Sequence, residues 1–272
     1  MALEGGWGRV GLRPLSALLP HEETIPSKVR RVASELERDG MQRDPLMVED
    51  ESSIVLDGMH RLAALATLGI EYAVCCAVDY SSAGISVRRW ARVYTAESSK
   101  AFADVLAGAG LSGRCSSTEA LDSLEMRREA VAAMTQGGCY TRRGGSELAR
   151  GFETVRKLDE LCSTAGWRRS FVPEDEVDVP LQDERNLVVL VARLEKKDVM
   201  SAGKSGSLFP CKTSMHIIDP RPVGADVPLR ELREGSRRTL ELRLKSHHTV
   251  LPANTKYGGR KYKERLVVLR GN

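Results

Sequence analysis

The sequence predicts a mixed α/β (α+β) protein made of two domains. Over residues 1–80, short apolar runs of strand length alternate with segments of helical periodicity, which is the pattern of a compact α/β unit. Further strand-like and helical segments follow a loop-rich middle. The length of 272 residues fits one large or two modest domains, at roughly 100–200 residues each. We therefore expect a first domain over 1–95, a second over 96–272, and a cleft between them.

Local signals predict the elements of the first domain. A helix is expected from Ser27, a residue type suited to the N-cap, to Asp39, where Gly40 ends it. A second helix is expected over 61–68, after a glycine turn. Strands are predicted where apolar residues are concentrated, over 10–15, 45–48, 54–56 and 72–78.

The rest of the chain is less regular. Residues 81–145 are expected to be mainly helical and loop-rich, with helices near 99–108 and 118–135. A longer helix is expected over 146–165, because Leu148, Phe152, Val155 and Leu158 recur at helical spacing. The acidic run 173–180 is flanked by prolines and predicts a loop. Strands are expected over 187–191, 213–218 and 265–269, and a short helix over 196–203.

Composition excludes several classes of protein. The chain is 42% hydrophobic and 29% charged, which is unlike collagen-like, low-complexity or wholly disordered sequences. The longest apolar run, over 72–78, is much shorter than the ~18 residues of a membrane span, so we expect no membrane partner. The first ten residues lack the basic and apolar stretches of a signal peptide, and we therefore expect a cytoplasmic protein. The six cysteines show neither CxxC nor zinc-finger spacing.

The net charge of +4 is unevenly distributed. Residues 237–272, which we call the basic tail, contain ten Lys/Arg and two acids; that is +8, and 4 − 8 leaves −4 for the remainder. A basic segment suggests an anionic partner, either a nucleotide, a phosphorylated product or a nucleic acid. An ordinary solvated surface is an equally good explanation.

The sharpest local signal is the run Val55-Leu56-Asp57-Gly58-Met59-His60-Arg61, in which a strand enters a glycine turn and then a helix. The first turn of a helix has unpaired N–H groups and a partial positive charge, which disfavours cations there. His60 and Arg61 are nevertheless placed in that turn. A bound phosphate would satisfy both the N–H groups and the cations. The alternative is that Arg61 extends into solvent or pairs with Asp57.

Two further segments have a composition suited to phosphoryl chemistry. Pro20-His21-Glu22-Glu23 offers a carboxylate that could accept a proton from a hydroxyl, although acids near a helix start are common. The second segment, 209–216, places hydroxyl and cationic side chains close together; its candidate residues are Lys212, Thr213, Ser214 and His216. The alternative for that segment is a polar loop that leads into a strand.

These three segments, in this order, resemble the free serine kinase family, whose fold is related to ParB and sulfiredoxin. The resemblance is good over 12–80, resumes at Trp90 and over 186–232, and includes 264–269; the stretch 96–180 aligns poorly. It is closest to the archaeal ADP-dependent members and the ATP-dependent member of a siderophore pathway. It implies a ParB/sulfiredoxin-like first domain and a second mixed α/β domain that contributes substrate-binding residues.

The resemblance also implies roles for individual residues. Glu22 would be the catalytic base, and Asp57 a second catalytic residue that positions Mg²⁺ or substrate. Gly58, Met59, His60 and Arg61 match the family's Asp-Gly-X-His-Arg phosphate-binding turn. The residues implied in substrate binding are Trp90, Lys212, Thr213, Ser214, His216 and Arg221.

Two departures from relatives narrow the function. Met215 stands where the family has an arginine in the substrate loop, so Lys212 or Arg221 would have to replace that cation, or the substrate could differ. Met59 stands where sulfiredoxin has its reactive cysteine, which excludes sulfiredoxin chemistry. ParB proper has a Gly-Glu-Arg-Arg-type turn and a following helix-turn-helix domain, and neither is found here.

The resemblance therefore implies a small-molecule kinase that uses ATP or ADP with Mg²⁺. Its expected substrate is a free amino acid, L-serine first, and its product O-phospho-L-serine for a biosynthetic pathway such as a siderophore's. The alternative is a ParB-like, nucleotide-dependent DNA-binding regulator; nucleic acid is the less favoured partner because aromatic residues make up only 5% of the chain. A ParB-like domain without activity is a third possibility, which the presence of both Glu22 and the 57–61 turn disfavours.

Overall fold

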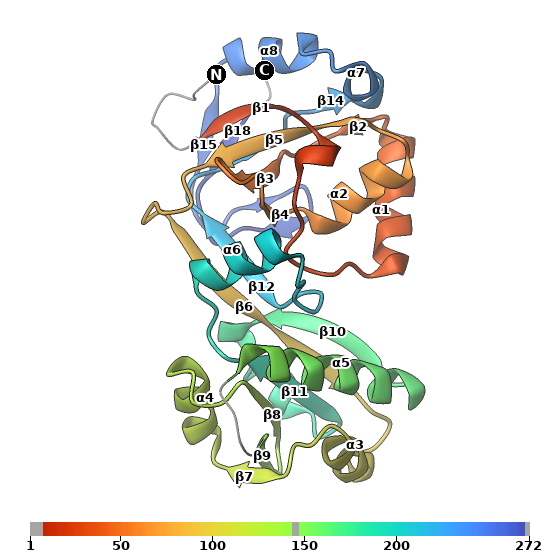
Figure 1. Cartoon of the computed structure of the whole chain (residues 1–272), viewed down its shortest axis with the longest axis vertical. Helices are drawn as coiled ribbons and strands as arrows, with labels where there is room; N and C mark the ends of the chain where they lie inside the picture. The colour runs from red at the N-terminus through yellow and green to blue at the C-terminus, as the bar shows by residue number, and fades with distance from the viewer. Residues whose placement is uncertain (1–7, 143–146, 270–272) are drawn as a thin grey trace. The chain divides into compact units, whose positions relative to one another are not determined.

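A computed structural model of the chain describes residues 8–142 and 147–269 and has a mixed α/β architecture, as expected (Figure 1). The chain forms two compact units. The first contains the described residues up to Val87, Lys196–Cys211, and the described residues from His216 onward. The second contains Arg88–Glu195 and Lys212–Met215. Two of the points at which the chain passes between units lie within strands β6 (Ile85–Thr95) and β12 (Ser214–Ile218).

These units differ from the predicted division at residue 95. The chain leaves the first unit after Val87, returns at Lys196, and returns again at His216. Segments assigned from sequence to the second domain therefore pack within the first unit. A boundary drawn along the sequence cannot represent a chain that returns to the same core.

A four-stranded sheet organises the first unit, in the order β1-β5-β3-β4. Strand β5 pairs antiparallel with β1 and parallel with β3, and β3 pairs antiparallel with β4. Helices α1 and α2 pack against each other beside this sheet (Figure 1). The bounds of these elements are β1 Arg9–Pro14, α1 Pro26–Asp39, β2 Met41–Gln42, β3 Leu46–Glu49, β4 Val55–Asp57, α2 Met59–Thr67 and β5 Tyr72–Val78.

The local predictions for this region are mostly confirmed. Strand β5 has the predicted bounds, and Gly40 ends α1 with a left-handed φ of 65°. The N-cap prediction is wrong: Ile25 occupies the cap and makes no side-chain cap bond, while Pro26 begins the helix. Proline has the right φ for a first helical position and lacks an N–H that would need a partner, so this start needs no capping side chain.

The later segments complete the first unit. A three-stranded sheet, β13-β18-β15, encloses a small core that contains Val223, Tyr262 and Leu266. The bounds are α6 Lys196–Ser205, β13 Arg221–Val223, β14 Val227–Pro228, α7 Leu229–Glu234, α8 Arg238–Lys245, β15 Thr249–Leu251, β16 Lys256–Tyr257, β17 Arg260–Lys261 and β18 Leu266–Val268, with a 3-10 turn at Leu15–Ala17.

The second unit is built on a sheet whose main path runs β10-β6-β11-β8-β9-β7. Helix α4 packs on β8 and β9, and α5 packs on α3 and on β8. The bounds are α3 Phe102–Gly108, β7 Gly113–Cys115, α4 Ser117–Glu125, β8 Val131–Thr135, β9 Gly138–Thr141, α5 Leu148–Thr164, β10 Arg168–Pro173 and β11 Asn186–Val191, with 3-10 turns at Ser99–Ala101, Glu174–Glu176 and Pro180–Gln182. Neither unit has, among its described residues, a helix that combines the length and apolarity needed to cross a bilayer.

The predicted helix over 118–135 is half wrong. Helix α4 begins with a capping box between Ser116 and Glu119, and ends at Glu125. Arg127 then takes a left-handed φ of 56°, and Val131–Thr135 form strand β8. The alanines here suggest a helix, but they are fully buried between neighbouring strands, and this tertiary packing overrides their propensity. Strands β6, β7, β9 and β10 were not predicted either, so the expectation that residues 81–145 are mainly helical is wrong. The predicted loop over 173–180 contains two of the 3-10 turns.

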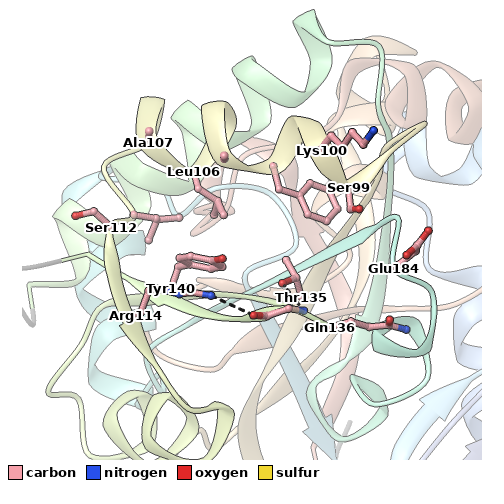
Figure 2. Close-up of a pocket in the computed structure, with 14 residues that line it drawn as sticks. Ser99, Lys100, Leu106, Ala107, Ser112, Arg114, Thr135, Gln136, Tyr140 and Glu184 are labelled. Carbon is pink, nitrogen blue, oxygen red and sulfur yellow. Dashed lines mark hydrogen bonds between the residues drawn. The ribbon is translucent and has the colours of Figure 1, made fainter.

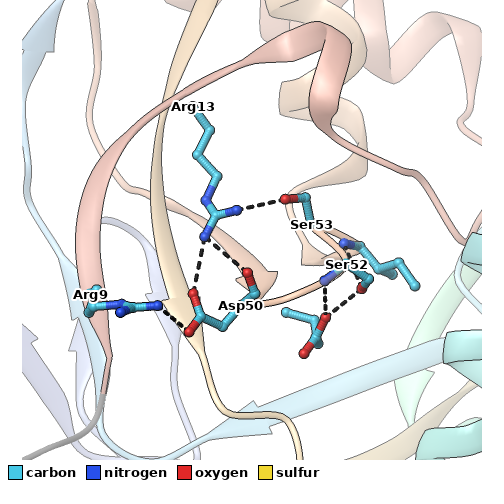
Figure 3. A network of polar contacts seen from close by, with 7 residues as sticks. Arg9, Arg13, Asp50, Ser52 and Ser53 are labelled. Carbon is cyan, nitrogen blue, oxygen red and sulfur yellow. Dashed lines mark hydrogen bonds and ion pairs between the residues drawn. The ribbon is translucent and has the colours of Figure 1, made fainter.

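A polar network fixes the turn between β3 and β4 to strand β1 (Figure 3). Arg13 donates hydrogen bonds to Ser53 Oγ at 2.6 Å and to the Asp50 carboxylate and carbonyl at 3.2 Å. Arg9 also donates to the Asp50 carboxylate, and this hydrogen bond lowers the pKa of Asp50 below its usual value. Because β4 ends in Asp57, the network anchors the strand that presents the predicted phosphate turn.

Gly203 marks a close approach between α6 and Ile54, the residue before β4. A Cβ atom added there would lie 2.7 Å from the Ile54 Cδ1 and Cγ1 atoms, and Ile54 is completely buried. We expect Gly203→Ala to lower the free energy of unfolding by about 1–2 kcal/mol, since overpacking outweighs the better helix propensity of alanine.

Urea unfolding measures this effect, with exposed Ser201→Ala in the same helix as the matched control. Adding Ile54→Val, which removes the clashing Cδ1 methyl, should make the double variant more stable than the sum of the two losses. A Gly203→Ala protein as stable as the wild type would contradict the close packing.

Candidate active site

The predicted phosphate turn joins the end of β4 to the start of α2. Gly58 is the N-cap of α2 and has a φ of 109°, which side chains other than glycine rarely tolerate. A Cβ atom there would also lie 2.5 Å from Leu46 Cδ2. The amide groups of residues 59–61 form the first turn of the helix, a position at which main-chain N–H groups and the helix dipole favour an anion.

The side chains of this turn have different surroundings. Met59 is buried in the core. His60 Nε2 accepts a hydrogen bond of 3.1 Å from the Ile25 N–H, so that nitrogen is unprotonated and the ring links α2 to the start of α1. Arg61 donates to the main-chain carbonyls of Asp44 at 2.5 Å and Pro45 at 3.2 Å. Arg61 therefore neither extends freely into solvent nor pairs with Asp57.

The partly buried Asp57 is linked through buried Arg221 to buried Glu264. Arg221, only 3% exposed, donates to Asp57 Oδ2 at 2.7 Å, to Glu264 Oε1 at 2.5 Å and to the His216 carbonyl at 2.8 Å. Burial alone would lower the pKa of Arg221, but Asp57 and Glu264 outweigh it and raise that pKa. Glu264 is 4% exposed. The side chain of Arg221 fixes the carboxylate at the start of the turn, and its predicted role in substrate binding stays a prediction.

Glu22 lies on a segment that runs beside β4. Residues 19 and 54 form a bridge, and the Val55 N–H donates to the Leu19 carbonyl at 2.8 Å. On the other side Glu22 forms a bridge with Phe209, so main-chain bonds hold it in place from both directions. Its side chain is 9% exposed. A carboxylate in such a setting is desolvated and fixed, as a general base requires.

Two buried histidines lie next to Glu22. His21 Nδ1 donates to the Val55 carbonyl at 2.7 Å, and its Nε2 lies 3.8 Å from Glu22 Oε1. His216 Nε2 bonds the Tyr80 hydroxyl at 2.7 Å, and the rings of His21 and His216 meet edge to face at 5.5 Å. Burial lowers the pKa of His21, although Glu22 opposes this, and it lowers the pKa of His216 further, with help from His21.

These depressed pKa values predict that stability falls in acid. An unfolded histidine binds a proton near pH 6.5, whereas His21 and His216 resist protonation when folded, so the unfolded state takes up more protons as the pH falls below 6.5. We expect the free energy of unfolding to fall below pH 6.5 by up to about 1.4 kcal/mol per pH unit for each histidine.

Urea unfolding between pH 5 and 8 measures this slope. His216→Gln should reduce the slope, while the exposed His247→Gln control should leave it unchanged. A wild-type protein equally stable at pH 5.5 and pH 7.5 would contradict the neutral state of the buried pair.

The other predicted substrate residues gather in the second unit. Lys212 Nζ lies 4.7 Å from the centre of the Trp90 ring, a cation–π contact, and Lys212 has a left-handed φ of 57°. Thr213 is fully buried and accepts a hydrogen bond from Arg92 at 3.3 Å. Ser214 and Met215 are also buried. The substrate-binding role of this group stays a prediction.

Comparison with known proteins shows which proteins the chain is similar to. No protein-family model matches it. It is 23% identical over 226 residues to an ATP-dependent L-serine kinase of Staphylothermus marinus, covering 79% of this chain and 88% of that protein. It is 24% identical over 224 residues to the ADP-dependent L-serine kinase SerK of Thermococcus kodakarensis, covering 80% and 90%.

The fold agrees with these sequence matches. A solved free serine kinase, in a form with one glutamate replaced by glutamine and in complex with AMP, superposes with a TM-score of 0.70 at 21% identity, covering 85% of this chain and 96% of that one. The chain resembles the free serine kinases in sequence and in fold. The chain is also 35% identical over 82 residues to a ParB-like protein of Sulfolobus acidocaldarius, a match that covers 30% of this chain and 41% of that protein.

Several residues around the turn of this free serine kinase homologue were not identified from its sequence. Glu264 and Tyr80 reach the site from distant parts of the chain, and His21 was seen only as a neighbour of Glu22. Arg260, predicted only as part of the basic tail, lies 3.6 Å from Asp57 Oδ2. No local sequence pattern indicates these contacts, because each contact joins residues that are far apart along the chain.

The second unit also has a pocket of about 720 Å³ (Figure 2). Apolar side chains of α3, among them Leu106, face the Tyr140 ring across it, and Arg114 lies 5.6 Å from the centre of that ring. No residue predicted from the sequence to bind nucleotide or substrate lines this pocket.

Proposed function

We propose that this protein transfers the terminal phosphoryl group of ATP or ADP to the hydroxyl group of a free amino acid, with L-serine as the first candidate and O-phospho-L-serine as its product. The placement of the fixed, desolvated Glu22 carboxylate beside the strand that ends in the 57–61 turn supports this most directly. The family relationship supports it as well, since the relatives named above are ATP- and ADP-dependent L-serine kinases. The ParB/sulfiredoxin-like character of the first unit is part of the same proposal.

In the proposed reaction, the terminal phosphate of the donor lies against the amide groups of residues 59–61. These amides and nearby guanidinium groups stabilise the charge that spreads over the equatorial oxygens during transfer. The hydroxyl oxygen attacks phosphorus as the bond to the leaving oxygen breaks, and Glu22 accepts the hydroxyl proton. Arg221 holds the Asp57 carboxylate in place while this happens.

Mg²⁺ as companion of the donor is part of the proposal. The described residues contain no group of three or more His, Cys, Asp or Glu side chains able to hold a metal ion. This fits Mg²⁺ bound mainly through nucleotide phosphates, which needs one or two protein carboxylates. Asp57 is the carboxylate of the turn and would hold the ion, which would neutralise phosphate charge when bound.

A phosphoryl-transfer assay tests the proposed function. The protein is incubated with Mg²⁺ and either ATP or ADP in the presence of L-serine, L-threonine or L-homoserine, and phosphorus NMR detects the phosphoamino acid. We expect L-serine to be phosphorylated with one of the two donors. Failure to form any phosphoamino acid with either donor, under conditions where the nucleotide binds, would overturn the kinase assignment.

A ParB-like DNA-binding regulator is the second candidate, supported by the match to a ParB-like protein and by the basic tail. Part of that tail is already paired, since Arg260 and Arg265 contact Asp57 and Asp219; Arg270 lies outside the described residues. A duplex-DNA shift assay at two salt concentrations separates the candidates, because binding driven by phosphate contacts should weaken steeply with salt.

A further inference from the structure

We propose that Arg260, on the β16–β17 hairpin, binds the terminal phosphate of the donor nucleotide at the 57–61 turn. This inference rests on the proposed function, since it assigns a residue to the same site. Arg260 was not among the candidate site residues, and it reaches the turn from a segment more than two hundred residues away in the sequence.

The arginine side chains near the turn differ in their capacity to bind a ligand. Arg221 is buried and donates to two carboxylates and a carbonyl. Arg61 donates to the carbonyls of the loop before β3. Arg260 differs from both, because its side chain is 46% exposed and its ion pair with Asp57 Oδ2 is 3.6 Å long, beyond the range of a direct hydrogen bond.

The side chain of Arg260 is held in position before any ligand binds. Its guanidinium group lies 4.7 Å from the centre of the Tyr262 ring, and Tyr262 is 6% exposed within the core of β13 and β18. The next acid along the chain, Glu264, is held by Arg221. A tight turn at Gly258 and Gly259, both with positive φ, closes the hairpin. The planar group is therefore held beside Asp57 with little conformational freedom left to lose on binding.

The guanidinium group of Arg260 would bind a phosphate more strongly than it binds Asp57. Asp57 already has a close partner in Arg221 at 2.7 Å, so it does not need Arg260 for neutralisation. A guanidinium group forms two parallel hydrogen bonds to a phosphate, and such charge-assisted bonds are stronger than a long ion pair. Asp57 directly precedes the N-cap of α2, so a phosphate held by the α2 amides would lie next to Arg260.

Calorimetric titration with AMP, ADP and ATP tests the inference. We expect Arg260→Gln to weaken binding of the true donor by about tenfold or more, because it removes a charge-assisted contact to the terminal phosphate. AMP, which lacks that phosphate, should bind within twofold of the wild type. Arg260→Lys keeps the charge but not the paired donors, and should recover only part of the loss.

Lys261→Gln is the matched control. Lys261 is the next residue of the same strand, is exposed, and points to the opposite face, so its removal should change no affinity by more than twofold. Equal losses for AMP and the donor, or equal losses in the Lys261→Gln protein, would overturn the inference.

The inference and the proposed function can fail separately. A wild-type protein that binds ATP or ADP with an Arg260-dependent preference over AMP, but phosphorylates no amino acid, would support Arg260 and overturn the kinase assignment. A kinase whose donor affinity is unchanged in Arg260→Gln would do the reverse. Absence of any nucleotide binding by the wild type would overturn both.

Discussion

Replacing Glu22 by glutamine should lower the rate of phosphoryl transfer by about 10²–10⁴-fold, the usual contribution of a positioned general base. Glutamine has nearly the same shape but cannot accept the hydroxyl proton. The fold should be unaffected, because main-chain bonds at Leu19 and Phe209 hold the segment in place, and these bonds do not involve the Glu22 side chain. Nucleotide affinity should stay within twofold of the wild type, since the proposed phosphate contacts come from the 57–61 turn.

Steady-state kinetics and calorimetry together measure this prediction. Glu23→Gln is the matched control, because Glu23 is the adjacent acid, is less buried, and should retain most of the activity. Full activity in Glu22→Gln would remove Glu22 from the mechanism. A loss of nucleotide binding as large as the loss of rate would give Glu22 a role in binding rather than in proton transfer.

Replacing Arg221 by methionine should lower the free energy of unfolding by about 3–5 kcal/mol, because it leaves the Glu264 carboxylate buried without its partner. Asp57 would lose its close partner as well. Thermal or urea unfolding measures the loss, and adding Glu264→Gln should restore part of it by removing the buried charge.

Arg265→Met is the matched control for this variant. Arg265 pairs with Asp219 at 3.0 Å, but the two side chains are 55% and 37% exposed, so the loss should be below about 1 kcal/mol. If Arg221→Met and Arg265→Met lowered the free energy of unfolding equally, the ion pairs of Arg221 with Asp57 and Glu264 would not stabilise the fold as we expect.

The sequence predicted the local elements better than their assembly. Strand β5 and the end of α1 followed from a pure apolar run and from Gly40, signals contained within a few residues. The 118–135 segment was misjudged because alanines that favour a helix in isolation are buried in the middle of a sheet. Such packing depends on strands far away in the sequence, which local periodicity does not encode.

The same limit applies to the candidate site. The 57–61 turn could be predicted, since a strand, a glycine and a helix start are adjacent in the sequence. Arg221 was noticed as a cation, but its bonds to Asp57 and Glu264 could not be, because 164 and 43 positions separate the partners. Arg260 could not be distinguished in the sequence from the other basic residues of the basic tail.

The long separation between Asp57 and Arg221 also has a consequence for synthesis on the ribosome. The first unit's sheet can pair once residues up to Val78 have emerged, yet the cation that neutralises Asp57 is made 164 residues later, and Glu264 later still. At roughly 5–20 residues per second, synthesis of those 164 residues takes about 8–30 seconds, during which β4 can form while Asp57 has no ion pair with Arg221. The 57–61 turn therefore acquires its ion pair with Arg221 late in synthesis, and a chain stopped after Glu195 would have the turn without Arg221 or Glu264.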